Sequence, residues 1–336
     1  MQASGRVTMR DIARETGFTV NTVSRALMGM PDISAATTAL IRDKAAQMGY
    51  VRNHMASSLR SGRTNCIALI VGHLTNPYFS IIFDSVEKAA DELGYTVMLF
   101  SSHEDDAREI IAIRTALSQH VDGIIFFPSQ KSTECLSLLR AGGIPFVILS
   151  REFVGEKADY VLCQEEEGGY LAARHLIEHG RKKLIYVYDN DLIHSINLRR
   201  EGFNRACAEF GVTDVRAIQN LDEANRDNAA GTAERIAGLY RLGYDGVVAF
   251  CDMVARRLIA QLHALNLRVP EDIGMIGYDN TDSVVPTTLP LCSIDGHCEE
   301  MGEAAVRLLD RRIKGDTSAE ERLLFPVEVV CRHSCG

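Results

Sequence analysis

The segment VTMRDIARETGFTVNTVSRAL, residues 7–27, contains two short amphipathic stretches separated by a glycine. Thr8 precedes the first stretch and is followed three residues later by Asp11, which is typical of a capped helix N-terminus. Gly17 ends this helix, and Thr19 can cap a second one whose apolar residues recur at helical spacing. Two helices joined by a tight glycine turn predict a helix-turn-helix, whose second helix presents its first turn to DNA.

The sequence that follows completes a small helical unit. Ser34 can cap a third helix, which Gly49 ends. We therefore predict an all-α headpiece over residues 1–49. Residues 50–64 are polar and form a linker with one further helical turn.

Charge is distributed unevenly along the chain. The 336 residues carry a net charge of −9. Residues 1–63 contain nine Lys or Arg and four Asp or Glu, a balance of +5, which leaves −14 for the remainder. A basic head on an acidic body is expected when the head alone contacts a polyanion such as DNA.

From residue 65 onward, short apolar runs alternate with amphipathic segments. Examples are KLIYVY (183–188), DGVVAFC (245–251) and IGMIGYD (273–279). Apolar strands separated by helices predict parallel sheets covered by helices on both faces. The strands are too numerous for one sheet, so we predict two α/β lobes. A ligand is expected between them, at the carboxyl ends of the strands.

Composition excludes several classes of protein. No apolar run approaches the roughly 20 residues of a membrane helix, and the first residues lack a signal-peptide pattern. The nine cysteines are scattered without a CxxC pair, which indicates reduced thiols in a cytoplasmic protein. Nothing in the sequence indicates a cofactor or a metal centre.

Several motifs in order resemble the lactose-repressor (LacI/GalR) family of bacterial transcription regulators. They are the 7–27 segment, NHMASSLRSG (53–62), LTNPYF (74–79), LRREGF (198–203) and the final FPVEVVCRHSC (325–335). The resemblance implies a headpiece, a hinge helix and two lobes like those of periplasmic sugar-binding proteins. It places lobe 1 at about 65–160 plus 296–324, and lobe 2 at about 161–295 plus 325–336.

The resemblance also implies how the head contacts DNA. Val20 and Asn21 lie in the first turn of the recognition helix, where the family chooses its bases, and Arg25 matches the family's base-reading arginine, which would seek guanine. By its chemistry, Val can contact a thymine methyl group and Asn can pair with an adenine. Phosphate contacts are expected from side chains with hydroxyl or amide groups. These are Thr8, Thr19, Thr22, Ser24 and Asn53. Val20 could instead pack in the headpiece core, and Arg25 could be a plain surface charge.

The hinge helix is expected at Asn53 to Leu59, with Met55, Ala56 and Leu59 at the DNA. Ala56 and Leu59 lie on one face of a helical turn, and in the family the paired leucines of a dimer wedge into the minor groove. So short a helix is marginal alone, because nucleation is costly. It can therefore act as an order–disorder switch.

The resemblance implies an effector pocket between the lobes. The predicted lining residues are Tyr78, Phe79, Phe126, Ser150, Arg199, Asp252 and Asp279. Arg199 would donate to hydroxyls or a carboxylate, and Asp279 would accept from sugar hydroxyls. Asp279 could instead cap a turn, and the aromatic residues could pack in the core.

The chain departs from common family patterns at several of these positions. Ser150 and Phe126 stand where polar ligand-contacting residues are frequent, and Gln164-Glu165 replaces a usual Asp-Asn pair. Fewer hydroxyl partners indicate a substituted or larger sugar, or another small molecule.

The segment HLIEH, residues 175–179, matches a zinc-peptidase pattern. No third ligand is evident beside it in the sequence, so we interpret it as the surface end of a lobe helix. Two further functions fit parts of the sequence, namely a secreted sugar-binding protein and a DNA-binding protein without a ligand. The first is opposed by the basic head and the missing signal peptide.

We therefore expect a non-enzymatic, homodimeric repressor that acts on nucleoid DNA. Its partners are a pseudo-palindromic operator and a small-molecule effector, with a carbohydrate favoured.

Overall fold

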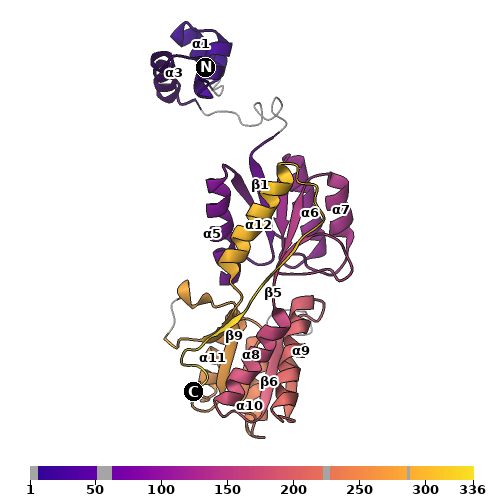
Figure 1. Cartoon of the computed structure of the whole chain (residues 1–336). Helices are drawn as coiled ribbons and strands as arrows, with labels where there is room; N and C mark the ends of the chain where they lie inside the picture. Colours follow the sequence, from indigo (N-terminus) through magenta and orange to yellow (C-terminus); the bar gives the residue numbers. More distant parts are fainter. Residues whose placement is uncertain (1–6, 51–62, 222–227, 286–287) are drawn as a thin grey trace. The chain divides into compact units, whose positions relative to one another are not determined.

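A computed structural model describes residues 7–50, 63–221, 228–285 and 288–336 of the chain (Figure 1). The chain divides into two compact units between Thr64 and Asn65. The core predicted from the sequence starts at the same position. The predicted hinge and phosphate-contact residues of the linker lie outside the described residues. They are Asn53, Met55, Ala56 and Leu59.

The first unit contains the three predicted headpiece helices, α1 (Met9–Thr16), α2 (Val20–Leu27) and α3 (Ala35–Gln47). The predicted capping box is present, because the Asp11 carboxylate accepts from the Thr8 backbone N–H at 3.0 Å and the Thr8 hydroxyl accepts from the Asp11 N–H. Each cap satisfies backbone donors that the first helical turn leaves unpaired. The three helix starts are therefore determined locally.

The headpiece has a small core. One apolar face of each helix is buried there, with Ile12, Val23 and Ile41 fully inaccessible. Gly17 separates α1 from α2 with φ +74°, a left-handed conformation that glycine adopts without strain. This tight turn brings α2 against α1 and leaves the first turn of α2 at the surface.

The second unit contains two six-stranded sheets. Sheet 1 has the strand order β11-β5-β4-β3-β1-β2, and all its neighbours are parallel. Its strands are β1 (Cys66–Val71), β2 (Thr96–Ser101), β3 (Gly123–Phe126), β4 (Phe146–Leu149), β5 (Asp159–Cys163) and β11 (Arg322–Phe325). The predicted parallel sheet of lobe 1 is confirmed.

Sheet 2 forms the centre of lobe 2, with the order β12-β10-β9-β8-β6-β7. It is parallel except for β12, which runs antiparallel to β10. Its strands are β6 (Leu184–Tyr188), β7 (Val215–Gln219), β8 (Gly246–Ala249), β9 (Gly274–Tyr278), β10 (Cys292–Asp295) and β12 (Glu328–Val330).

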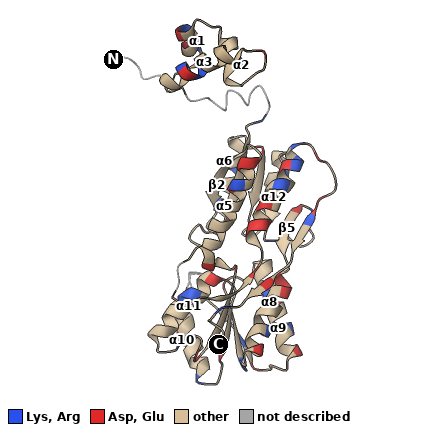
Figure 2. Ribbon diagram, turned by 60° about the vertical axis from the view of Figure 1, so that its left-hand side comes forward, with Lys and Arg blue, Asp and Glu red and all other residues tan. Residues whose placement is uncertain are grey.

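Helices cover both faces of each sheet, as predicted. One face of sheet 1 packs on α5 (Pro77–Glu92) and α12 (Cys298–Ile313), and the other on α6 (Asp106–Ser118) and α7 (Glu134–Gly142). One face of sheet 2 packs on α8 (Glu165–Glu178) and α9 (His194–Glu209), and the other on α10 (Ala229–Tyr240) and α11 (Asp252–Ala264). Figure 2 shows many of the charged residues on these helices, around the apolar strands.

The lobe boundaries differ slightly from the expectation. β5 stays in sheet 1 as far as Cys163, so lobe 1 extends past the predicted boundary at residue 160. Phe325 still belongs to β11 and sheet 1, one residue beyond the predicted limit of 324. The chain passes between the lobes after β5, after β10 and after β11. Among the described residues, no helix combines the length and apolar character that a membrane span requires.

Candidate functional site

The first turn of α2 presents its side chains to solvent. Val20 is 43% exposed although it is apolar, and Asn21 is exposed beside it. The interpretation of Val20 as a core residue is therefore wrong. An exposed branched side chain next to an amide at a helix start can contact a thymine methyl group and an adenine edge.

Arg25, one turn later, is paired with Asp32. Its Nε lies 2.8 Å from one carboxylate oxygen and an Nη nitrogen lies 2.7 Å from the other. The pair is open to solvent, so it is weak and exchangeable. In this structure the carboxylate occupies the two donor positions that a contact with guanine would require.

The other predicted DNA contacts in the headpiece are hydroxyl groups. Thr8 donates to Asp11 Oδ2 at 2.7 Å, and the Thr19 and Thr22 hydroxyls lie 2.9 Å apart. These bonds fix the direction of each hydroxyl at a helix start, where backbone N–H groups also favour a phosphate. Ser24 is partly exposed on the same helix as Thr22. All four hydroxyls therefore belong to the surface formed by α1, α2 and their caps.

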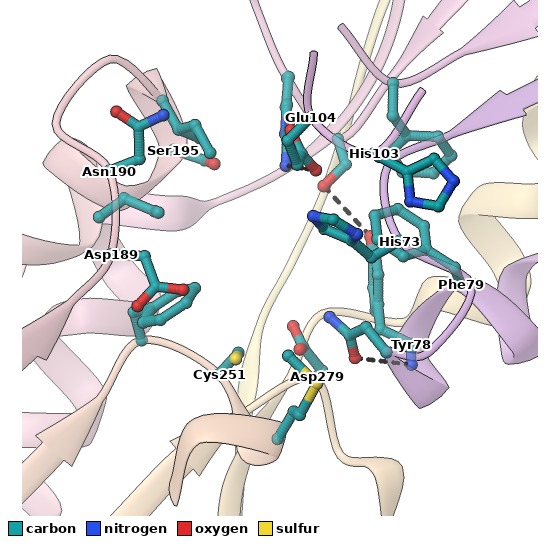
Figure 3. A pocket seen from close by; sticks show the side chains of 18 of the residues that line it. His73, Tyr78, Phe79, His103, Glu104, Asp189, Asn190, Ser195, Cys251 and Asp279 are labelled. Carbon is teal, nitrogen blue, oxygen red and sulfur yellow. Dashed lines mark hydrogen bonds and ion pairs between the residues drawn. The ribbon is translucent and has the colours of Figure 1, made fainter. Parts of the chain in front are cut away.

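The second site is a cavity of about 440 Å³ between the two lobes (Figure 3). It lies at the carboxyl ends of the strands, where parallel sheets typically bind ligands. Its volume is in the range of small-molecule sites. Five of the seven predicted effector residues line it. They are Tyr78, Phe79, Ser150, Arg199 and Asp279.

Arg199 is buried at the cavity wall on α9. Its Nε donates to Glu165 Oε2 at 2.6 Å, and Nη1 donates to the Phe250 carbonyl at 2.6 Å. The guanidinium carbon lies 3.4 Å from the centre of the Tyr278 ring. Burial opposes the charge on this group, but Glu165 together with the nearby Tyr278 and Asp279 outweighs it, so the pKa of Arg199 stays above its ordinary value. The arginine is thus a fixed cation at the cavity wall.

Close packing of α8 on α9 makes this ion pair possible. A Cβ atom at Gly169 would overlap the backbone of Arg199, and one at Gly202 would overlap the backbone of Glu166. The two helices therefore approach to backbone contact only because both residues are glycines. This approach brings Glu165, the first residue of α8, to Arg199.

Asp279 follows β9 directly and faces the cavity with 7% of its surface exposed. Its backbone has φ +101°, unusual for a residue with a side chain, and its N–H donates to the Ile294 carbonyl at 2.9 Å. Burial raises the pKa of its carboxyl group, and Arg199 opposes this shift. Its carboxylate accepts no hydrogen bond from the described residues, so its oxygens are available to a ligand.

Lobe 1 supplies an aromatic wall. Tyr78, Phe79 and Phe127 pack edge to face, with ring centres 5.2–6.2 Å apart, and all three line the cavity. The Tyr78 hydroxyl donates to Ser150 Oγ at 3.1 Å. The prediction of Phe126 at this wall is wrong. Successive side chains of β3 point to opposite faces, and Phe126 is fully buried on the face that packs against α6 and α7.

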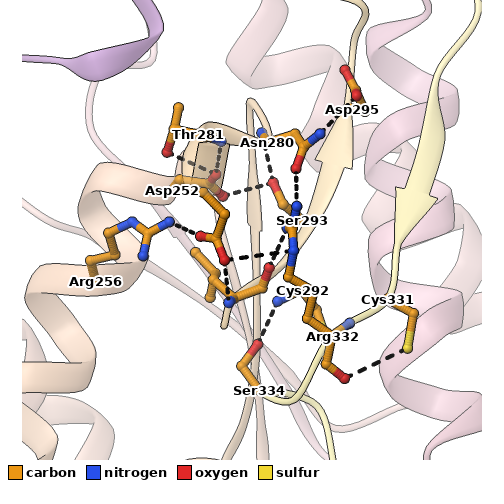
Figure 4. A network of polar contacts seen from close by, with 12 residues as sticks. Asp252, Arg256, Asn280, Thr281, Cys292, Ser293, Asp295, Cys331, Arg332 and Ser334 are labelled. Atoms are coloured by element: carbon orange, nitrogen blue, oxygen red, sulfur yellow. Dashed lines mark hydrogen bonds and ion pairs between the residues drawn. The ribbon is translucent and has the colours of Figure 1, made fainter. Parts of the chain in front are cut away.

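Asp252 also does not line the cavity. Its side chain is fully buried, and its neighbours Cys251 and Met253 reach the cavity instead. Its oxygens accept from the Thr281 N–H at 2.7 Å and the Ser293 hydroxyl at 2.7 Å (Figure 4). Burial raises the pKa of Asp252 to about 6, against these hydrogen bonds. Asp252 therefore supports the loop that follows Asp279 rather than a ligand.

Several cavity residues were not predicted. His73 and His103 face each other with ring centres 5.6 Å apart, and Glu104 forms a two-point ion pair with Arg151 at 2.6 and 2.9 Å. Burial lowers the pKa of His73, so its ring is neutral near pH 7 and can both donate and accept. These residues lie in loops after β1, β2 and β4, where no sequence periodicity marks them.

One hydrogen bond joins the lobes beside the cavity. The Gln130 side-chain oxygen, in a loop of lobe 1, accepts from the His194 N–H at 3.0 Å, at the start of α9. This bond can form only while the two lobes are close together here, so a wider opening between them would break it.

Two family models match the chain. Residues 8–53 match "Bacterial regulatory proteins, lacI family", and residues 173–335 match a "Periplasmic binding protein-like domain". The HTH-type transcriptional repressor PurR of Vibrio vulnificus (strain CMCP6) is 30% identical over 308 residues, which cover 91% of this chain and 92% of that protein. The HTH-type transcriptional regulator DegA of Bacillus subtilis (strain 168) is 29% identical over 332 residues, 98% of each chain.

A solved structure of similar fold is a LacI family transcriptional regulator from Enterococcus faecium with bound ribose. It has a TM-score of 0.71 and 26% identity, and the match covers 80% of this chain and 98% of that one. Fold and sequence together define a two-lobe regulator with a helix-turn-helix head. The chain belongs to the lacI family of bacterial regulatory proteins, and it is a DNA-binding transcriptional regulator rather than an enzyme.

Proposed function

We propose that this regulator represses transcription as a homodimer, each headpiece reading one half of a pseudo-palindromic operator. Binding of a sugar or sugar derivative between the lobes changes its operator affinity. The protein acts on the chromosome in the bacterial cytoplasm.

The proposed operator contacts rest on exposure and charge. Val20 and Asn21 offer an apolar and an amide contact at the start of α2, and Arg25 follows on the same helix. The net charge of +5 on residues 1–63 favours the approach to DNA, while the acidic remainder of the chain opposes non-specific contact. Two-fold symmetry of a dimer matches a pseudo-palindromic site.

The single observation that carries the effector proposal is the presence of an acceptor and a donor side by side in one wall of the cavity. Asp279 offers acceptor oxygens without a donor among the described residues, and Arg199 is a fixed donor in the same wall. Vicinal hydroxyls can satisfy both groups at once. The rings of Tyr78 and Phe127 supply an apolar surface for the carbon skeleton of a sugar.

The proposed switch is a change in the angle between the lobes. A ligand held by Asp279 of lobe 2 and by the Tyr78 wall of lobe 1 stabilises one opening over others. A ligand shifts an equilibrium only by its differential affinity for the two states. The opening in turn sets the DNA affinity of the headpiece.

The test begins with a thermal-shift screen of the full-length protein against carbohydrates and metabolites, because a ligand of the folded state raises its unfolding temperature. Operator affinity is then titrated against the identified effector. We expect Asp279→Asn to need at least about tenfold more effector, since losing a charged acceptor typically costs more than 1.4 kcal/mol. Operator affinity without effector should stay at the wild-type value.

Asp214→Asn is the matched control, because Asp214 is an exposed carboxylate of the same lobe outside the cavity. An Asp279→Asn protein that responds at the wild-type effector concentration would show that the ligand binds elsewhere. Loss of operator binding in the absence of effector would assign Asp279 a structural role.

A further inference from the structure

A second cluster of reactive side chains lies in lobe 2, away from the effector cavity. Cys292 is the first residue of β10, so it lies at the end of sheet 2 opposite to the strand ends that form the cavity. Cys331 and Cys335 belong to the C-terminal tail after β12, and His175 lies in the last turn of α8. The fold therefore gathers residues that are up to 160 positions apart in the sequence.

The ligand atoms of this cluster are close to one another. A ring nitrogen of His175 and the sulfurs of Cys292 and Cys335 all lie within 4.8 Å of one another. A second group, which shares His175, contains Cys331 and His179 within the same limit. In a tetrahedral zinc site with Zn–S bonds of about 2.3 Å, neighbouring sulfurs lie roughly 3.8 Å apart. The three atoms of the first group are therefore within reach of one ion, and the Cys331 sulfur, which lies within 4.8 Å of a His175 ring nitrogen in the second group, would have to turn toward it.

The histidine of the cluster points independently to a ligand. Only 8% of the His175 surface is exposed, and its Nε2 atom is buried without a hydrogen-bond partner among the described residues. A buried polar atom without a partner costs free energy, so native structures usually satisfy it. A cation beside the two buried thiols would satisfy it.

Several contacts that hold the C-terminal tail in place do not use the thiols. The Ser334 hydroxyl donates to the Met275 carbonyl at 2.6 Å and accepts from the Cys292 N–H at 2.8 Å, as Figure 4 shows for the second bond. The Arg181 guanidinium donates to the Cys335 carbonyl at 2.9 and 3.2 Å. Cys292 and Cys335 are thus positioned before any ion binds, which reduces the entropy lost on binding.

Neighbouring groups have the arrangement typical around metal ligands. The His179 Nδ1 atom lies 2.7 Å from the His175 carbonyl, and this contact fixes the direction of the His179 ring beside the cluster. The Arg332 backbone N–H donates to the Cys292 sulfur at 3.1 Å, and such a bond favours the thiolate form. Arg181 supplies a positive charge close to Cys335.

We propose that His175, Cys292, Cys331 and Cys335 bind one Zn²⁺ ion per chain. Three sulfurs and one imidazole nitrogen form a closed tetrahedral set, which is the set of a structural zinc site. Each thiol releases its proton to solvent as its Zn–S bond forms, and the Cys335 thiol gives up its hydrogen bond to the Met275 carbonyl. Two charges on zinc and three thiolates leave one negative charge, which Arg181 offsets.

The ion would join the tail to α8 and β10. Because the ligands come from three separate elements, zinc binding would stabilise lobe 2 against unfolding. The interpretation of HLIEH as the surface end of a lobe helix is wrong for His175, which is buried, although His179 is exposed. A peptidase zinc would need an open coordination position, which a set of four protein ligands would not leave. The sequence shows no third ligand close to His175 and His179, whereas the fold brings thiols there.

The experiment uses full-length protein purified without added reductant under nitrogen. Zinc content is measured by mass spectrometry after exhaustive dialysis, and Zn²⁺ affinity by competition with a chromogenic chelator. We expect one zinc per chain and a rise in unfolding temperature when Zn²⁺ is returned to stripped protein. Co²⁺ in place of zinc should give the thiolate-to-metal absorption of a tetrahedral sulfur site.

Cys331→Ala is the principal variant, since Cys331 is exposed and its loss should leave the fold intact. We expect at least tenfold weaker zinc binding from it, and complete loss from Cys292→Ala. Cys207→Ala is the matched control, because Cys207 is buried in the same apolar cluster of lobe 2 but lies outside both groups of ligands. It should bind zinc like the wild type.

Three results would each overturn the proposal. The first is wild-type protein without zinc that also fails to bind added Zn²⁺. The second is zinc binding that Cys331→Ala and His175→Gln leave unchanged, because the ion would then lie elsewhere. The third is seven reactive thiols instead of nine in the denatured, metal-free protein, since two cluster cysteines would then form a disulfide.

Discussion

Two arginines, one in each compact unit, pair with carboxylates in opposite surroundings. In the headpiece, the side chains of Arg25 and Asp32 are 39% and 51% exposed. At the cavity, those of Arg199 and Glu165 are 10% and 4% exposed. Water screens the first pair, whereas the second has exchanged its hydration for fixed protein contacts. Arg25 can therefore exchange Asp32 for a DNA group at little cost, whereas the buried pair of Arg199 and Glu165 stabilises the folded core.

The largest expected effect comes from breaking the buried pair. Glu165→Ala leaves the Arg199 guanidinium buried without its carboxylate, and we expect a loss of about 3–5 kcal/mol in the free energy of unfolding. Urea unfolding followed by circular dichroism measures it. Glu166→Ala is the control, because Glu166 is the next residue of α8 and pairs with Arg205 at the surface.

A double variant sharpens this prediction. Arg199→Met together with Glu165→Leu removes both charges and keeps the volume, so it should recover most of the lost stability. If Glu165→Ala and Glu166→Ala lower the free energy of unfolding by the same amount, the prediction is wrong, because the buried pair would then contribute no more to stability than a surface pair. The same reasoning makes Arg199→Ala an unsuitable test of effector binding, because it would strand Glu165.

An intermediate effect is expected from removing the exposed arginine. Arg25→Ala should weaken specific operator binding roughly tenfold to hundredfold and relax the preference at one G·C pair, because a bidentate contact to guanine is lost. Fluorescence anisotropy with operator and single-base variants measures it. Arg14→Ala on α1 is the control. An equal loss of affinity for operator and for random DNA would contradict base reading. The unfolding temperature of the variant should equal that of the wild type.

The smallest effect is expected from removing the negative charge of Asp32, the exposed partner of Arg25. Asp32→Asn frees the Arg25 donors and removes one negative charge close to the DNA, so operator affinity should rise by about two- to fivefold. The gain should shrink as salt is raised from low to high concentration, because the added attraction is electrostatic. Unchanged or weaker binding at low salt would mean that Asp32 orients Arg25 productively.

Local chemistry explains why the headpiece was predicted closely. Thr8, Thr19 and Ser34 each accept a backbone N–H at the start of the helix that the sequence placed there. Such caps involve residues within three positions of one another, so the sequence alone shows them. The same holds for Gly17, whose left-handed backbone ends α1.

The cavity was predicted only in part, and β3 shows why. All four of its residues are buried, so no alternation of polar and apolar residues marks which side chains face the cavity. Phe126 was placed at the wall, whereas the next residue, Phe127, lies there. In the same way, Asp252 was predicted to line the cavity, whereas Cys251, the residue before it, lies there.

The sequence by itself determined the family, the three capped helices, the two largely parallel sheets and five of the seven predicted effector residues that line the cavity. These follow from local hydrogen bonding, from periodicity and from motifs in fixed order. Only the tertiary structure decided that Glu165 is the partner of Arg199, since that pair requires α8 and α9 to meet at Gly169 and Gly202. It also decided that His175 lies close to Cys292 and Cys335 on one side and to Cys331 on the other. Residues distant in the chain become neighbours through packing, which no local pattern records.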